Sequence, residues 1–186
     1  MAKNIHGRIK SNLGYAFLGA DNKGVCFGSV VTFFHETIVN NNYFLKSDDI
    51  HISLGRSETL QMKYQKKNFD VDAILEEQFL QRIKISEDQV YKPSKFLNEI
   101  YSRYSNSHVG GYLLELTGDN SSHAVAFFIT RDNKLLYLNS NHGLYLLDDI
   151  EKDLKDLKTN FFDIKKNKYD LYSLYHVIET PKNFFN

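Results

Sequence analysis

The sequence predicts an α+β fold, with helices in the first part of the chain and an antiparallel sheet in the second. Before residue 85, apolar residues recur at helical spacing in two segments. After residue 108 the chain changes to short runs rich in β-branched and aromatic residues, separated by turns. Helices followed by consecutive strands are typical of α+β folds. We expect a single domain over residues 1–186, helical over about 1–108 and sheet-forming over about 109–186.

The composition excludes several classes of partner and cofactor. The chain has 186 residues, 23 Lys and Arg against 23 Asp and Glu, and one cysteine. A formal net charge of zero gives no general attraction to nucleic acid or to an anionic membrane. One cysteine excludes an intramolecular disulfide and a multi-cysteine metal site, and the glycines do not have phosphate-loop spacing. We therefore expect no nucleic-acid partner, no metal and no cofactor.

No apolar run of the sequence reaches the length of a membrane span, and the first residues lack the apolar core of a signal peptide. We expect no integral membrane segment and no secretion through a route that reads such a peptide. A single cysteine is typical of proteins of a reducing compartment.

The first helix is expected to begin at Cys26 and to end near Asn40–Asn42, although Val30–Thr32 also suits a strand. The apolar residues of one helical face are Phe27, Val30, Val31, Phe34 and Ile38. Cys26 then lies in the first turn, where unpaired N–H groups and the helix dipole favour a thiolate. A thiolate is a nucleophile. The alternative is that this lone cysteine is a small buried hydrophobic residue.

The remaining elements are predicted from spacing and caps, after an irregular lead-in over residues 1–23. Three further helices are expected in the first part: Ser57–Lys66 capped by Ser57, one from Asp70 with apolar positions up to Phe79, and a short one after Pro93 capped by Ser94. A polar linker over 102–111 follows. The expected strands are Tyr112–Leu116, His123–Thr130, Leu135–Leu138, Leu144–Leu147 and Asp170–Ile178, with a helix from Asp148–Asp149 to about Thr159.

A predicted hairpin brings together two residues that suit acid–base chemistry. His123 begins one strand, and Asn139 ends the strand that returns after the turn at 131–134. A symmetric hairpin places residue 123 opposite 141 or 142, and a small bulge places it opposite 139. In either case both side chains emerge at the same end of the hairpin. The amide oxygen of Asn139 can then accept from one ring nitrogen of His123 and leave the other for Cys26.

Three short motifs now resemble a known family. Gly24-Val25-Cys26 opens a helix, Ser122-His123-Ala124-Val125 opens a strand, and Asn139-Ser140-Asn141-His142-Gly143 follows the return strand. In this order and spacing they resemble the YopT/AvrPphB type of papain-like cysteine protease. The resemblance covers about Gly24 to Leu147. It implies a papain-like fold in which the helix that carries the nucleophile packs on an antiparallel sheet.

The resemblance implies a Cys26–His123–Asn139 triad, with one departure from the family pattern. The family usually has Asp at the position of Asn139; an amide orients imidazole but supplies no charge. Asp132 and Asp119 suit the third position less well, and His142 is a lesser alternative for the base. No glutamine precedes Cys26, so the oxyanion-binding amide is assigned to Asn22, with Asn12 or the backbone of residues 19–24 as alternatives.

The function implied by the resemblance is that of a bacterial effector protease, secreted into a host cell without a Sec-type signal peptide and otherwise cytoplasmic. Its partner would be a host protein substrate such as a small GTPase or a kinase. Two other hypotheses stay open. The same triad supports acyl transfer or deamidation, or the protein is a catalytically decayed module that binds a host protein.

Overall fold

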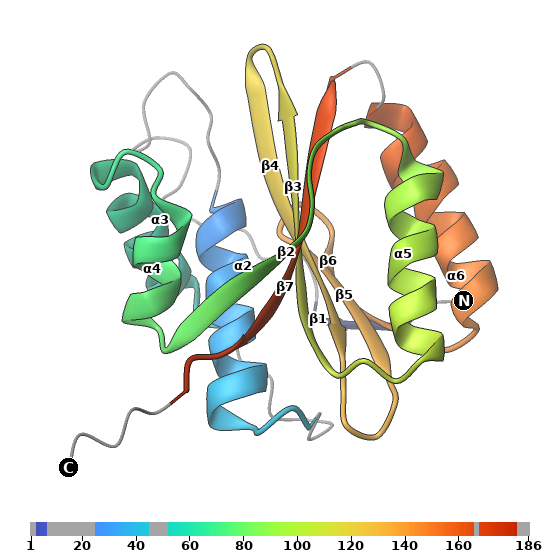
Figure 1. Ribbon diagram of the computed structural model, residues 1–186, viewed down its shortest axis with the longest axis horizontal. Coiled ribbons are helices and arrows are strands. Elements are labelled where there is room, and N and C mark those ends of the chain that lie inside the picture. The colour runs from blue at the N-terminus through green and yellow to red at the C-terminus, as the bar shows by residue number, and fades with distance from the viewer. Residues whose placement is uncertain (1–2, 7–24, 45–51, 166–167, 182–186) are drawn as a thin grey trace.

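The computed structural model describes residues 3–6, 25–44, 52–165 and 168–181, and these contain a seven-stranded sheet between two layers of helices (Figure 1). The strand order is β1-β6-β5-β4-β3-β7-β2, and every neighbouring pair is antiparallel. The strands are β1 (Lys3–His6), β2 (Leu80–Val90), β3 (Gly110–Gly118), β4 (Ser121–Ile129), β5 (Leu135–Asn139), β6 (Gly143–Leu147) and β7 (Leu171–Glu179). The α+β prediction is confirmed.

The five strands predicted after residue 108 all form, within three residues of their expected ends. Two strands were not predicted. Residues Lys3–His6 pair with β6 as strand β1, so the expected irregular lead-in is wrong for these residues. Residues Leu80–Val90 pair with β7 as strand β2. The division at residue 108 is corrected accordingly, because both edge strands of the sheet come from the part expected to be helical.

The helices are α2 (Cys26–Phe34), α3 (Leu54–Lys66), α4 (Val71–Glu77), α5 (Pro93–Ser105) and α6 (Ile150–Leu157). Helix α2 continues as a π-helical segment, His35–Asn40, and α6 continues as another, Lys158–Phe162, before a 3₁₀ turn at Asp163–Lys165. The predicted start of the first helix at Cys26 and its end near Asn40 are confirmed. The helix predicted from Asp149 is confirmed as well, since the Asp149 side chain accepts from the Lys152 N–H.

Two of the predicted helix caps are wrong. Helix α3 begins earlier than expected, because Ser53 accepts the Arg56 N–H and is the cap, whereas Ser57 is buried inside the helix. Helix α5 begins at Pro93, whose fixed φ and missing N–H suit a first helical position, so Lys92 and not Ser94 precedes it.

The second predicted helix ends earlier than expected. Asp70 caps α4 through the Ala73 N–H, but the helix stops at Glu77. Phe79 has a φ of 59° and is 61% exposed, so it lies outside the helical apolar face.

The sheet separates two cores, and side chains alternate between them along each strand. Helices α2, α3 and α4 cover one face, and α5 and α6 cover the other (Figure 1). In β4, Ala124, Ala126 and Phe128 pack toward α2. Val125, Phe127 and Ile129 pack toward α5 and α6. Helix α2 is buried along nearly its whole length between α3 and strands β4 and β5. This packing places the start of α2 beside the start of β4. No helix within the described ranges is both long and apolar enough to cross a membrane.

Candidate active site

Cys26 is the first residue of α2 and is half-buried. Its sulfur lies against the start of β4, within reach of three backbone N–H groups, those of Ala124, Phe27 and Cys26 itself. Burial raises the pKa of the Cys26 thiol, and these three N–H groups oppose the rise only in part. The N–H groups at the helix start favour the thiolate, as expected, but the effect of burial on the pKa is larger. A nucleophilic Cys26 needs a base to take its proton.

His123 lies near the start of β4, opposite Leu116 of β3. The pairing of Ala126 with Leu138 continues toward a symmetric hairpin, which sets residue 123 opposite 141. Asn139 is then the diagonal neighbour of His123 on the same face of the sheet. Nε2 of His123 lies 3.1 Å from Oδ1 of Asn139. The side chains of His123 and Asn139 therefore meet in a symmetric hairpin, and the bulge that the sequence analysis gave as an alternative is not needed.

The amide of Asn139 has a single possible orientation. Its Oδ1 accepts the backbone N–H of Asn141 at 3.0 Å, and a backbone N–H can only donate. Its Nδ2 donates to the hydroxyl of Tyr137 at 3.0 Å. Because Oδ1 is the atom that faces His123, Nε2 must carry a proton and donate it. In the neutral ring Nδ1 is then the basic nitrogen.

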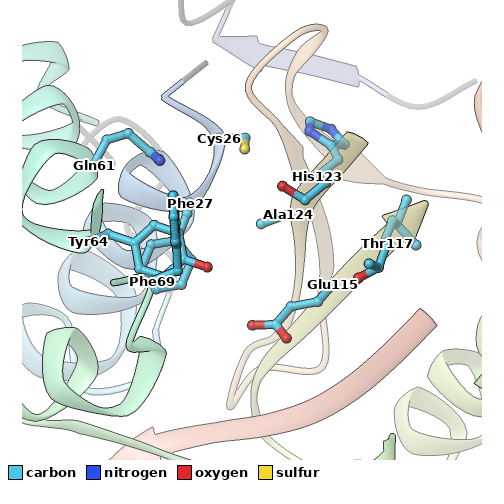
Figure 2. A pocket seen from close by; sticks show the side chains of 11 residues that line it. Cys26, Phe27, Gln61, Tyr64, Phe69, Glu115, Thr117, His123 and Ala124 are labelled. Atoms are coloured by element: carbon cyan, nitrogen blue, oxygen red, sulfur yellow. The ribbon is translucent and has the colours of Figure 1, made fainter. Parts of the chain in front are cut away.

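Cys26 and His123 line one pocket between α2–α3 and the ends of β3 and β4. Figure 2 shows Cys26 and Gln61 on the helical wall and His123 and Ala124 on the strand wall. The structure thus brings Cys26 and His123 to one pocket and joins His123 to Asn139, as the sequence analysis expected from their order.

The helical wall of the pocket is aromatic. Phe27 packs on Tyr64 with 4.1 Å between ring centroids, and Tyr64 meets the ring of Phe69 edge to face at 5.1 Å. Burial, with a smaller effect of Glu115, raises the pKa of Tyr64 to about 12. At neutral pH Tyr64 is therefore a neutral phenol.

Glu115 lines the strand wall, where burial raises the pKa of its carboxyl. Its partner is Arg82, whose Nη1 lies 3.3 Å from Oε1 of Glu115 and whose Nε lies 2.7 Å from Oδ1 of Asp72. The guanidinium also sits over the ring of Tyr175 at 4.2 Å. The ion pair with Arg82 thus holds Glu115 in place at the strand wall of the pocket.

Gln61 of α3 is a pocket residue that the sequence analysis missed. Its side chain is buried beside the first turn of α2, where Oε1 accepts the N–H of Gly28 at 3.0 Å. Nothing near Gln61 in the sequence distinguishes it from other polar residues of a helix. Only the packing of α3 on α2 brings it to Cys26.

The alternative site residues lie elsewhere. Asp132 sits in the turn after β4, where Lys134 lowers the pKa of its carboxyl, and Asp119 sits in the turn after β3. The His142 ring packs on Phe161, with 4.5 Å between centroids. None of these three is among the residues that line the described pocket. Asn22, Asn12 and the backbone of residues 19–24 fall outside the described residues.

The described part of the chain holds no group of three or more His, Cys, Asp or Glu side chains that suits a metal ion. Cys26 and His123 line the pocket, and Asn139 contacts His123 from outside that lining. A cysteine at a helix start, an imidazole and an amide that orients it are the groups that thiol chemistry uses.

Comparisons with solved structures give the same class of fold. The structure superimposes on the Pseudomonas avirulence protein AvrPphB with a TM-score of 0.56 and 11% identity, covering 95% of each chain. It also superimposes on the ubiquitin-specific protease encoded by a murine cytomegalovirus tegument protein, solved in complex with a ubiquitin-based suicide substrate. That match has a TM-score of 0.50 and 10% identity, and covers 97% of this chain and 89% of the viral one.

The chain thus has the α+β fold that AvrPphB and the viral protease also have, over nearly the full length of the chains compared. The likeness lies in structure and not in sequence: no protein-family model matches the chain, and no curated protein matches it.

Proposed function

We propose that this protein is a cysteine peptidase, formed by one domain over residues 1–186, in which Cys26, His123 and Asn139 act as a triad. The observation that carries the proposal is the hydrogen bond from His123 Nε2 to Asn139 Oδ1. This bond makes Nδ1 the basic nitrogen of His123, a residue that lines one pocket together with Cys26. The papain-like fold supports the same assignment.

The chemistry follows from these roles. His123 takes the proton of the Cys26 thiol, and the sulfur attacks a carbonyl carbon, so that the carbonyl electron pair moves to oxygen. The tetrahedral adduct collapses, the C–N bond breaks, and the leaving amine takes the proton from His123. Water, deprotonated by the same imidazole, then hydrolyses the thioester. Asn139 keeps the ring in place through both steps but adds no charge.

The substrate in this proposal is a protein of a host cell, and the enzyme is an effector delivered into that cell. The likeness to a Pseudomonas avirulence protein and to a protease that was crystallised with a ubiquitin-based substrate supports this choice. Purified small GTPases and kinases are the first candidate substrates to incubate with the purified protein. Mass spectrometry of the treated target separates a cut peptide from deamidation or acyl transfer through the same thioester.

Thiol reactivity tests the triad. Iodoacetamide is used to label the wild type, Cys26→Ser, His123→Ala and Asn139→Ala between about pH 5 and 9. We expect fast wild-type labelling of Cys26 at pH 6, because the imidazole takes the thiol proton. In His123→Ala the labelling should move above the pKa of an ordinary thiol, about 8.5, because burial raises the pKa of Cys26.

Asn139→Ala should fall between wild type and His123→Ala, since the ring remains but its orientation is lost. Labelling of the wild type that rises only near pH 8.5 and is indifferent to His123 would overturn the proposal. The protein would then be a decayed binding module, and Cys26→Ser would keep its full effect in cells.

A further inference from the structure

Gln61 is a buried amide aimed at the start of the helix that carries Cys26. Its side chain is 2% exposed and lines the pocket together with Cys26. Its Oε1 accepts the N–H of Gly28, the third residue of α2. Because a backbone N–H can only donate, the oxygen is fixed on Gly28, and Nε2 is the atom left for the pocket. Figure 2 shows this nitrogen directed toward Cys26.

Within the described ranges, the hydrogen bond of this amide is the one that Oε1 accepts. Nε2 is not one of the buried polar atoms that lack a partner, and it faces the pocket that Gln61 lines with Cys26. A donor in that position is suited to a ligand that accepts a hydrogen bond beside the thiol.

The start of α2 adds donors on the same side. The N–H groups of Cys26 and Phe27 belong to the first helical turn and lie near the sulfur. Gln61 engages only the next N–H, that of Gly28. The unsatisfied end of a helix that continues without a break to Asn40 favours negative charge.

We propose that Gln61 Nε2, together with the N–H groups of the first turn of α2, binds the oxyanion that forms when Cys26 attacks a carbonyl. The amide takes the place that the sequence analysis assigned to Asn22, from a helix that follows Cys26 in the chain. This inference rests on the proposed thiol chemistry and adds a catalytic residue to it. Donors aimed at a developing oxyanion accelerate acyl transfer, and loss of one costs about 10²–10³-fold in rate.

Two reagents distinguish the loss of the Gln61 hydrogen-bond donor from a loss of reactivity of the Cys26 thiol. With p-nitrophenyl acetate, a C–S bond forms, the carbonyl pair moves to oxygen, and the adduct expels p-nitrophenolate, so the reaction passes through an oxyanion. With iodoacetamide, the thiolate displaces iodide from a saturated carbon and no oxyanion forms. Both rates are measured at the pH where thiolate formation is complete, so that a shifted thiol pKa does not enter.

Gln61→Glu and Gln61→Met are the informative variants. Glutamate keeps an oxygen for the Gly28 N–H but removes the donor, and methionine removes both. We expect acylation by p-nitrophenyl acetate to fall about 10²-fold in each, with iodoacetamide labelling unchanged. Gln65→Met is the matched control, one turn further along α3 and outside the lining of the pocket, and should leave both reactions unchanged.

The outcomes are distinguishable. Wild-type acylation in Gln61→Glu, with or without a loss in Gln61→Met, overturns the inference, because the amide then only anchors α2. An equal loss of both reactions overturns it too, because the thiol itself has been displaced. If His123→Ala labels with iodoacetamide as the wild type does, the proposed function is wrong, whatever the Gln61 variants show.

Discussion

Asn139 holds His123 through an amide whose other contacts lie inside the protein. It is 4% exposed, and its Nδ2 donates to the hydroxyl of Tyr137, which is fully buried in the core beneath α5 and α6. Tyr137 precedes Asn139 by two residues on β5 and so shares its face of the sheet. The orientation of the imidazole is therefore set by a chain of hydrogen bonds that starts in the core, far from solvent.

Tyr137→Phe tests this chain of hydrogen bonds. The change leaves Nδ2 of Asn139 buried without its acceptor, so we expect a loss of about 1–3 kcal/mol in the free energy of unfolding. We also expect slower iodoacetamide labelling of Cys26 at pH 6, because the amide that orients His123 is less firmly held. Urea denaturation and the pH profile of labelling measure the two effects.

Tyr145→Phe is the matched control. Its hydroxyl donates to the carbonyl of His142 at 3.0 Å and is not one of the hydrogen-bond partners given above for the Asn139 side chain. It should cost about 0.5–1.5 kcal/mol and leave the pH profile of labelling unchanged. A labelling profile for Tyr137→Phe that matches the wild type contradicts the positioning role.

Sequence reasoning could predict that Cys26, His123 and Asn139 lie close together, because each stands at a boundary that local patterns predict: a helix start, a strand start and a strand end. The fixed orientation of Asn139 was not predictable, since it depends on the backbone of Asn141 and on Tyr137 in three dimensions. Gln61 was missed for the same reason. It reaches Cys26 through the contact of two helices, and no spacing along the chain encodes that contact.

Helices α2 and α3 pack as closely as backbones allow, and this closeness brings Gln61 to the pocket. A Cβ added at Gly28 would lie 1.9 Å from the carbonyl oxygen of Ser57 and 2.9 Å from the backbone nitrogen of Gln61. The hydroxyl of Thr32 donates to the carbonyl of Gly28 at 2.8 Å. This buried hydroxyl therefore has a hydrogen-bond partner within the contact between the two helices. The position admits only glycine because the atoms that a side chain would meet are backbone atoms.

Gly28→Ala should therefore force the two helices apart. We expect a loss of about 3 kcal/mol in the free energy of unfolding, measured by urea denaturation. Acylation by p-nitrophenyl acetate should fall as well, because Gln61 moves away from Cys26 with its helix.

Gly55→Ala is the control for the change of residue type. A Cβ at Gly55 meets nothing within 4 Å, so alanine there should be neutral or stabilising by up to about 1 kcal/mol. If Gly28→Ala proves as stable and as reactive as Gly55→Ala, the close contact of α2 and α3 does not position the site.

Strand β2 is an element that the sequence patterns did not predict. Ile83 and Val90 are 49% and 77% exposed, and the register with β7 shifts twice along the strand. An edge strand of this kind has no sustained alternation of buried and exposed residues, so the sequence resembles a polar loop. Its pairing with β7, about ninety residues later, is what holds it extended. The meander from β3 to β6 was predictable because each of its turns has a local signal.

The whole molecule has two cores that share one sheet, and only one of them adjoins Cys26. Phe96 of α5 is fully buried in the other core, where it meets Phe162 at 5.0 Å and Tyr172 at 5.2 Å between ring centroids. This second core also contains Tyr137, so it adjoins the site through the hydrogen bond from Asn139 to the Tyr137 hydroxyl.

Phe96→Ala should cost about 3–5 kcal/mol in the free energy of unfolding. Below its unfolding transition we expect slower iodoacetamide labelling at pH 6, because Phe96 packs on Phe162, which packs on Tyr137, the residue that holds Asn139. Val90→Ala, at an exposed edge position, should change stability by less than about 0.5 kcal/mol. A wild-type labelling rate in folded Phe96→Ala would mean that the packing of this core does not affect the position of Tyr137.

Both outer strands of the sheet belong to the first half of the chain, whereas β3 to β7 between them belong to the second half. During synthesis from the N-terminus, Cys26 therefore leaves the ribosome long before the histidine that would activate it. Strand β2 has no pairing partner until β7 has also been synthesised. The thiol of a nascent chain therefore lacks its proposed base until the strands of the second half have been made and the sheet has closed.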